Sequence, residues 1–229
     1  LRTDQQKGKP APPIQKPYPE NADLIDLPDP EDLDVGGSVS VRQAIAARQS
    51  HRRFTDAALS LEELAFLLWS TQGIHKVWRS GIAVRRTAPS AGARHPFETY
   101  LVVNRVEGLQ PGLYRYLSIE HKLLLAFTDR GIGRRAAAAC HDQRFVAQSA
   151  VTFVWTALPY RTEWRYALMT PKLVNLDAGH VCENLYLAVE GIGAGTCAIG
   201  AYNQQQMDAL LKVDGEDEFA IYVAPVGKV

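Results

Sequence analysis

Apolar residues recur at helical spacing in several stretches of this chain, and residues that begin or end helices flank these stretches. Ser60 and Glu63 form a capping-box pattern, and Gly73 ends the leucine-rich segment that they open. Thr170 is an N-cap candidate before proline at the first helical position, and Gly191 ends that segment. The pattern predicts helices over about 40–49, 60–73, 131–141, 170–191 and 203–212.

Three of these helices have a defined apolar face in the sequence. The positions that share a face are Val41, Ala44, Ile45 and Arg48 in the first helix, Leu61, Leu64, Leu67 and Leu68 in the second, and Leu173, Leu176, Val181, Leu185 and Ala188 in the fourth. We expect the leucines of the second helix to point inward.

Runs of β-branched and aromatic residues between turn signals predict the strands. They cover residues 100–104, 112–117, 121–127, 150–158, 196–199 and 219–225. The continuous apolar run at 150–158 is typical of a central strand. Helices and strands are mixed without βαβ alternation, and no Gly-x-Gly-x-x-Gly follows a strand. The order therefore indicates an α+β fold and not a Rossmann domain.

Prolines are concentrated at the start of the chain. Seven of the 13 lie in the first 30 residues, and such a segment cannot form a packed helix or a central strand. We therefore expect an extended arm over residues 1–34 and one domain over 35–229. The arm would be a linker from a membrane anchor or a strap across a partner subunit that buries Ile25 and Leu27. Because numbering begins at Leu1, we expect the native N-terminus to be missing, which leaves the compartment open between cytoplasmic and exported.

The composition is that of an ordinary globular protein, with 46% apolar and 22% charged residues. Lysines plus arginines balance aspartates plus glutamates at 25 each, which argues against nucleic acid or an anionic membrane as the main partner. No apolar run in the sequence approaches the ~18 residues that span a bilayer. The cysteines, Cys140, Cys182 and Cys197, are odd in number and lack CxxC spacing, so we expect buried thiols and neither disulfides nor a metal site.

Two segments are candidates for binding an anion and a flat group. Arg48, Ser50 and Arg52 lie where the first helix ends, and two arginines with a hydroxyl donor suit a phosphate monoester. The residues alone leave open a solvated basic turn.

The second segment is the loop over residues 86–96. Pro89 fixes one φ, Gly92 permits a close backbone approach, and Pro96 should hold His95 extended. The side chains between them are small, which suits packing against a flat group, although a simple surface turn remains an alternative. Ser90 and His95 also raise the question of a serine hydrolase, but Gly-x-Ser-x-Gly is absent.

Three blocks in this order resemble the FMN-dependent nitroreductase superfamily and, within it, the SagB-type dehydrogenases. The blocks are Arg48-Gln-Ser-His-Arg-Arg-Phe54, Arg86-Thr-Ala-Pro-Ser-Ala-Gly-Ala-Arg-His-Pro96 and Leu176-Asp-Ala-Gly-His180. The resemblance covers roughly residues 35–229. It implies a nitroreductase-like α+β fold with a central, mainly antiparallel sheet flanked by helices. It also implies a homodimer with FMN between the subunits.

The resemblance further implies roles for individual residues. Arg48, Ser50 and Arg52 would grip the FMN phosphate, with Gln49 beside the pyrimidine edge of the flavin. The loop residues Pro89, Ser90, Ala91, Gly92 and Ala93 would lie along the isoalloxazine and ribityl chain. A backbone amide of Gly200 or Ala201 would lie near flavin N5, and Lys228 is the cation left near the C-terminus to approach the phosphate. The glycines at 191, 193 and 195 are explained by a helix end and a tight entry into a strand, because the P-loop lysine is missing.

Trp164-Arg165-Tyr166 departs from the SagB-type pattern, in which a lysine and tyrosine pair is thought to abstract a proton. Arginine stays protonated and cannot be the base, but its charge would favour the phenolate of Tyr166. An aromatic cluster without proton chemistry is the alternative. Asp177 and His180 supply too few ligands for a metal, and we expect a hydrogen-bonded polar core pair.

The expected function is an FMN-dependent oxidoreductase that moves hydride to or from flavin N5, with NAD(P)H or a small-molecule or peptide substrate as its partner. Two chemistries stay open: reduction of nitroaromatics, quinones or flavins, and oxidation of azoline rings in a modified peptide. The competing hypothesis is an inert or flavin-free interaction module that kept the fold. Metal-dependent hydrolysis is a third and weaker alternative.

Overall fold

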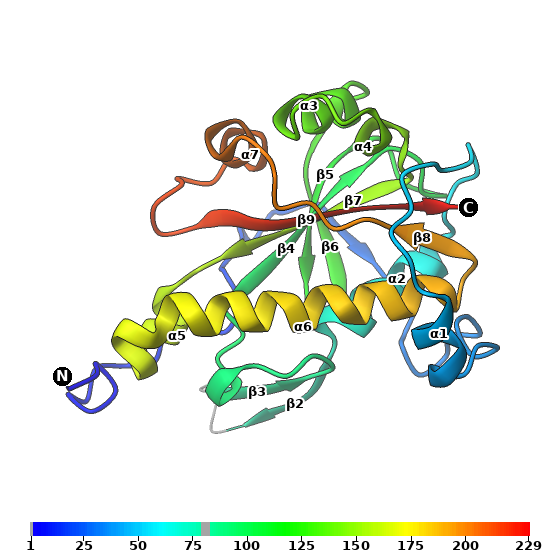
Figure 1. The fold of residues 1–229 in the computed structure, drawn as a ribbon. Helices are drawn as coiled ribbons and strands as arrows, with labels where there is room; N and C mark the ends of the chain where they lie inside the picture. Colours follow the sequence, from blue (N-terminus) through cyan, green and yellow to red (C-terminus); the bar gives the residue numbers. More distant parts are fainter. Residues whose placement is uncertain (1, 79–82) are drawn as a thin grey trace.

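A seven-stranded antiparallel sheet forms the centre of the protein, which we describe from a computed structural model over residues 2–78 and 83–229 (Figure 1). The strand order is β1-β6-β5-β4-β7-β9-β8. The strands are β1 (Leu24–Asp26), β4 (Phe97–Val103), β5 (Gly112–Leu117), β6 (Lys122–Thr128), β7 (Val151–Ala157), β8 (Ala194–Thr196) and β9 (Phe219–Lys228). Every pair of neighbours in this sheet runs antiparallel, which confirms the predicted α+β class with a central antiparallel sheet.

Helices cover both faces of the sheet, and the alternation of side chains along the strands separates two cores. Leu101 and Val103 of β4 pack with α2 (Leu61–Gln72) and α6 (Thr170–Glu190). Tyr100 and Val102 point the other way, toward α3 (Ile132–Ala139), α4 (Arg144–Gln148) and α7 (Gln204–Leu211). Figure 1 shows α6 running across its face of the sheet, with α3, α4 and α7 on the opposite side. Both faces of β7 are buried, so apolar side chains occupy both, and its two threonines, Thr152 and Thr156, are buried as well.

Shorter elements surround these layers. Helix α1 (Val41–Ala47) precedes residues 48–53, which we call the basic segment. Strand β2 (Ile74–Trp78) pairs with β3 (Ala83–Arg86) in a separate two-stranded sheet. Helix α5 (Tyr160–Tyr166) leads into α6 through a 3₁₀ turn over Ala167–Met169. Ala167 sits at that junction with φ 46° and ψ −121°, a backbone conformation that favours glycine.

The sequence located the main elements but misjudged several details. The N-cap of α6 is Met169, and Thr170 is already helical and donates its hydroxyl to the carbonyl of Ala167 at 2.7 Å. Leu176 is 51% exposed, because the buried face of α6 follows Val174, Asp177, Ala178 and Val181 instead. The strand expected over 196–199 is β8, two residues earlier, with Ile199 in an isolated bridge to Val223. Val41 and Ile45 of α1 are exposed. Five elements of the structure, β1, β2, β3, α4 and α5, were not predicted from the sequence.

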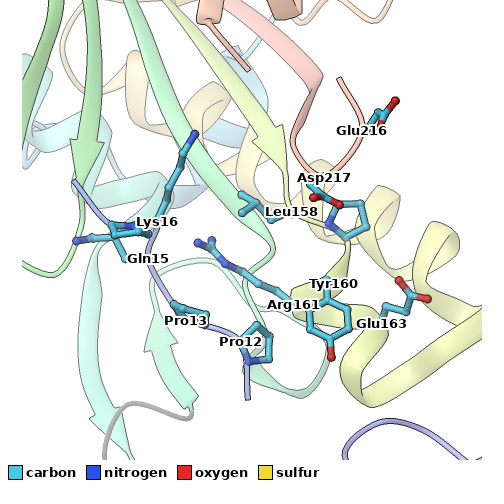
Figure 2. A pocket seen from close by; sticks show the side chains of 12 residues that line it. Pro12, Pro13, Gln15, Lys16, Leu158, Tyr160, Arg161, Glu163, Glu216 and Asp217 are labelled. Atoms are coloured by element: carbon cyan, nitrogen blue, oxygen red, sulfur yellow. The ribbon is translucent and has the colours of Figure 1, made fainter. Parts of the chain in front are cut away.

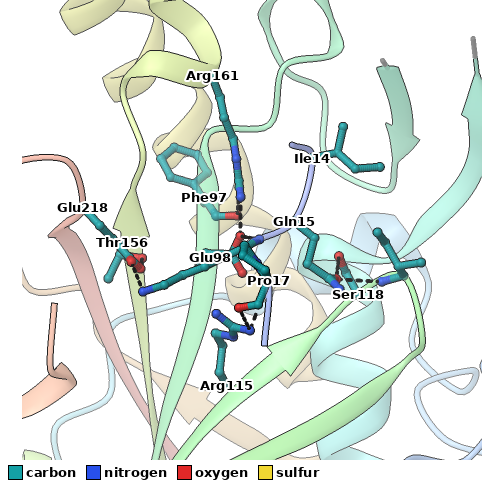
Figure 3. Close-up of polar contacts among 12 residues, drawn as sticks. Ile14, Gln15, Pro17, Phe97, Glu98, Arg115, Ser118, Thr156, Arg161 and Glu218 are labelled. Atoms are coloured by element: carbon teal, nitrogen blue, oxygen red, sulfur yellow. Dashed lines mark hydrogen bonds and ion pairs between the residues drawn. The ribbon is translucent and has the colours of Figure 1, made fainter. Parts of the chain in front are cut away.

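The proline-rich segment lies across its own subunit and is held through both its main chain and its side chains (Figure 3). The N–H of Lys16 donates to Oε1 of Glu98 at 2.8 Å, and Arg115 donates to the carbonyls of Lys16 and Pro17, each at 3.1 Å. The ammonium of Lys16 pairs with Glu218. Under the strap Glu98 also pairs with Arg161 at 2.5 Å, and both side chains are buried. We call residues 14–17 the strap.

Glu98→Gln is expected to lower the free energy of unfolding by about 2 kcal/mol, because the amide oxygen can keep both hydrogen bonds while the charge that offsets buried Arg161 is lost. Urea unfolding followed by circular dichroism measures the change. Glu120→Gln is the control, because this half-buried carboxylate accepts hydrogen bonds from Gln15 and Tyr18 but forms no ion pair among the described residues, and we expect a change of less than about 0.5 kcal/mol. Equal stability of Glu98→Gln and the parent would contradict the importance of this ion pair.

Candidate flavin site

Arg48, Ser50 and Tyr186 form one polar cluster at the end of α1. Arg48 is the C-cap of α1, and its guanidinium carbon lies 5.3 Å from the centre of the Tyr186 ring. The Ser50 hydroxyl is 2.9 Å from the Tyr186 hydroxyl. Among the described residues, neither Arg48 nor Arg52 forms an ion pair with a carboxylate. Two guanidinium groups and a hydroxyl without an acidic partner are a donor set that fits a phosphate.

The backbone after Arg48 is fixed against the edge strand β8. Ser50 bridges to Thr196 in parallel fashion, and the N–H of His51 donates to the carbonyl of Thr196 at 2.9 Å. Gly195 leaves the space that the His51 ring occupies, since a Cβ there would lie 2.6 Å from that ring. Gly227 does the same for the ring of Phe54, at 2.8 Å. These glycines thus let the basic segment close over the sheet edge.

The loop predicted to meet the flavin is anchored to α6 through Asp177. The Ser90 hydroxyl donates to Asp177 Oδ2 at 2.5 Å, and the N–H of Ala91 lies 3.2 Å from Oδ1. Burial raises the pKa of the Asp177 carboxyl, and the hydrogen bonds from Ser90 and Ala91 act in the opposite direction. His180 is exposed, so the expected core pair is wrong in its second member. Asp177 instead holds the loop at its Ser90 end.

Gly92 brings this loop against the two residues predicted to be catalytic. It has φ 59°, and a Cβ at this position would lie 2.6 Å from the Tyr166 hydroxyl and 3.0 Å from Cδ of Arg165. The Arg165 guanidinium carbon is 5.7 Å from the centre of the Tyr166 ring. The structure therefore places Tyr166, Arg165 and the loop in one contact, at the α5–α6 junction.

His95 does not adopt the extended conformation expected before Pro96. Its φ is 45°, because its N–H donates to the Ser90 hydroxyl at 2.9 Å and its ring Nε2 lies 3.0 Å from the carbonyl of Val84. Because a carbonyl oxygen only accepts, the buried ring donates from Nε2. Burial, followed by the nearby charge of Arg86, lowers the pKa of His95 to about 3.

The free energy of unfolding should fall as the pH drops from about 6.5 toward 3, because the unfolded chain protonates His95 first. The stabilisation that comes from the neutral His95 ring is fully present above the pKa that this histidine has in the unfolded chain. Below that pKa, it is lost at up to about 1.4 kcal/mol per pH unit. Urea unfolding of the parent and His95→Gln between pH 4.5 and 7.5 isolates this residue, since the other histidines contribute to both proteins. Identical pH slopes would contradict the buried neutral ring.

The remaining predicted flavin-binding residues lie in less defined surroundings. Gln49, Arg52, Gly200 and Ala201 are exposed, and a Cβ on Gly200 would meet no atom within 4 Å. Lys228 is already engaged, since its ammonium pairs with Glu63 and donates to the carbonyl of Ile192 at 2.6 Å. Tyr186 is the residue that sequence reasoning missed. It lies on α6 nine residues after Asp177, or about 14 Å along the helix axis, and no local signal distinguishes it from a core tyrosine.

Two cavities differ in their position relative to the predicted flavin loop. One of about 470 Å³ lies between the strap and the start of α5, as Figure 2 shows, and its wall includes Pro12, Tyr160 and Glu163. None of the residues predicted to bind FMN lines it. The other, of about 320 Å³, is lined by Pro89, Ser90 and Ala93 together with Trp78 and Arg85. The second cavity is therefore the one beside the predicted flavin loop.

Three further findings concern the described part of the chain. Cys140, Cys182 and Cys197 are buried free thiols, as expected. In residues 2–78 and 83–229, His, Cys, Asp and Glu side chains form no group of three or more that could hold a metal ion. No helix in these same ranges combines the length and apolar character that a membrane crossing requires.

Comparison with known proteins defines the class. The profile of the Nitroreductase family matches residues 45–228. A Methanocaldococcus jannaschii protein, provisionally named a nitroreductase, is 29% identical to this chain over 204 residues. The match covers 89% of this chain and 96% of the relative. A crystal structure of a protein from Ralstonia eutropha JMP134, also provisionally named a nitroreductase, superposes with a TM-score of 0.74 at 25% identity, covering 96% and 99% of the two chains. Fold and sequence together support a general oxidoreductase role. The chain belongs to the Nitroreductase family.

Two more distant proteins show the range of this fold. The trifolitoxin-processing protein of Rhizobium leguminosarum bv. trifolii is 26% identical over 143 residues, which are 60% of this chain and 38% of that protein. The NADPH:FMN oxidoreductase of Vibrio harveyi, complexed with NAD⁺, has a TM-score of 0.57 at 17% identity, covering 82% and 68% of the chains. At this low identity, the similarity to the Vibrio harveyi enzyme shows only a shared fold.

Proposed function

We propose that this protein is an FMN-dependent oxidoreductase. The observation that carries the proposal is that Arg48 and Arg52, which flank Ser50 in the sequence, have no carboxylate partner in the described chain. Bound FMN would supply hydride transfer at N5. The family and the flavin oxidoreductase of Vibrio harveyi support flavin use.

Each part of the chain has a task in this proposal. Arg48, Ser50 and Arg52 bind the phosphate, with Gln49 beside the pyrimidine edge and Lys228 reaching the phosphate only if it leaves Glu63. The loop residues Pro89, Ser90, Ala91, Gly92 and Ala93 present backbone and small side chains to the ring and ribityl chain. The amides of Gly200 and Ala201 would donate toward N5, where a donor stabilises developing charge.

The test of this function is the flavin itself. Purified protein should be yellow, and the chromophore released by denaturation should be identified as FMN by its absorbance and mass. Colourless protein that cannot be reconstituted with FMN would favour the alternative, an inert interaction module with the same fold.

The substrate is proposed at the level of two chemistries. The first is reduction of nitroaromatics, quinones or flavins by NAD(P)H. The second is oxidation of an azoline ring in a modified peptide, for which the contact of Tyr166 with the flavin loop at Gly92 is the specific observation. Similarity to the trifolitoxin-processing protein also favours the second. That oxidation removes a hydride, which flavin N5 would accept, and a proton, which Tyr166 would accept as the phenolate.

We further propose a homodimer, because apolar side chains are exposed along α1 and at the start of α6. Leu168 is 82% exposed, and Met169, Leu176, Val41 and Ile45 are exposed as well. A second copy would cover them. Light scattering should give twice the mass of the chain, and a monomer that retains flavin would contradict the dimer.

A further inference from the structure

Tyr186 joins the two segments on which the proposed phosphate site is built. Its side chain projects from α6, its ring faces Arg48, and its hydroxyl contacts Ser50 Oγ, as described above. The N–H of Ala198, just after β8, also reaches that hydroxyl at 2.9 Å. Tyr186 therefore touches two of the proposed phosphate-binding residues, although it is itself buried, with 8% of its surface exposed.

The direction of these hydrogen bonds matters for the chemistry of Ser50. Because the Ala198 N–H donates to the tyrosine oxygen, the phenolic hydrogen is free to be donated onward to Ser50 Oγ. Ser50 then keeps its own hydrogen for an acceptor outside the cluster. A phosphate monoester near neutral pH mainly accepts hydrogen bonds, so this direction prepares Ser50 to bind it.

Backbone contacts alone do not set this arrangement. The bonds from residues 50 and 51 to Thr196 fix the main chain, but the Ser50 side chain is free to rotate about χ1. The Tyr186 hydroxyl selects one rotamer, and the ring restrains Arg48 by its aromatic face.

We propose that Tyr186 is a positioning residue for the phosphate of FMN, acting through Ser50 and Arg48. This inference rests on the proposed function. It predicts an effect confined to the phosphate end of the ligand, since Asp177 anchors the ring-binding loop separately on the same helix.

The experiment compares FMN with riboflavin, which lacks the phosphate. Dissociation constants are measured by quenching of flavin fluorescence on the flavin-stripped protein, and the ratio of riboflavin to FMN values reports the phosphate contribution. Tyr186→Phe keeps the ring and loses the hydroxyl, and we expect the ratio to fall about tenfold with riboflavin binding unchanged. Tyr202→Phe removes a partly buried hydroxyl that donates to the Ala220 carbonyl, and should leave the ratio unchanged.

A second comparison separates positioning from a merely structural role. In the Ser50→Ala background, Tyr186→Phe should lower the ratio by less than about twofold, because the hydroxyl acts through Ser50 and the ring that faces Arg48 is kept in the variant. An unchanged ratio in Tyr186→Phe, or equal weakening of riboflavin and FMN, would overturn the inference while leaving the proposed function intact. Parent protein that binds neither flavin would overturn both.

Discussion

Arg48→Ala combined with Arg52→Ala is expected to weaken FMN binding by about 10²–10⁴-fold. Each charge-assisted contact to a phosphate contributes about 1.5–3 kcal/mol, and the double variant removes two of them. Arg48 is half-buried against Tyr186 and Arg52 is exposed, so we expect Arg48 to account for the larger share. Flavin content after purification and titration of the stripped protein measure the loss.

Arg53→Ala is the matched control, because this exposed arginine directly follows the proposed pair. It should retain FMN within about threefold of the parent. Riboflavin, which lacks the phosphate, should bind the parent, the double variant and Arg53→Ala with similar affinity. If the double variant purified with a full complement of FMN, the phosphate site would have to lie elsewhere in the chain.

Tyr166→Phe is expected to retain FMN and to lower turnover of an azoline peptide by about 10²–10⁴-fold, the usual contribution of a placed general base. The hydroxyl that is lost lies against Gly92 at the edge of the proposed flavin loop. Arg165→Lys should be tolerated or beneficial, since it restores the lysine and tyrosine pair of the SagB-type pattern. Stopped-flow measurement of flavin reduction by the peptide separates this step from reoxidation.

Reduction of a quinone by NADPH gives the contrasting case. Simple hydride transfer needs no base on the protein, so Tyr166→Phe should change that rate by less than about threefold. Tyr160→Phe is a control on the same helix, because its hydroxyl contacts Asp4 and not the loop. Equal activity of Tyr166→Phe and the parent on every substrate would end the proton-transfer role.

The elements that the sequence predicted are those with strong local signals. The capping box and the leucines of α2, and the uncharged, largely apolar run of β7, determine their structure locally. Helix α5 was missed because its seven residues are mostly polar or aromatic and begin after Pro159 without a side-chain cap. The conformation of His95 was mispredicted because its hydrogen bonds to Ser90 and Val84, earlier in the same part of the chain, outweigh the effect of Pro96 on the residue before it.

In the candidate site too, the sequence indicated some residues, whereas others are recognised only from the structure. The residue types at 48–52 and 89–93 suggested anion and flat-ring binding before any contact was known. Their supports on α6, Asp177 and Tyr186, are 86 or more positions away in sequence and become visible only through tertiary contacts. For Lys228 the sequence was misleading. Its position near the C-terminus suggested a cation available to the phosphate, but in the structure its ammonium pairs with Glu63.

The way in which the strap is held has a consequence for how this part of the chain can vary. Glu98 and Arg115 recognise the N–H and carbonyl groups of Lys16 and Pro17, which any substitution short of a new proline leaves in place. Inserting or deleting one residue would instead shift these groups by about 3.3 Å and break the pairing with Glu98 and Arg115. The main-chain part of this hold therefore depends on the length of the strap more than on residue identity, whereas the ion pair with buried Glu218 depends on the Lys16 side chain.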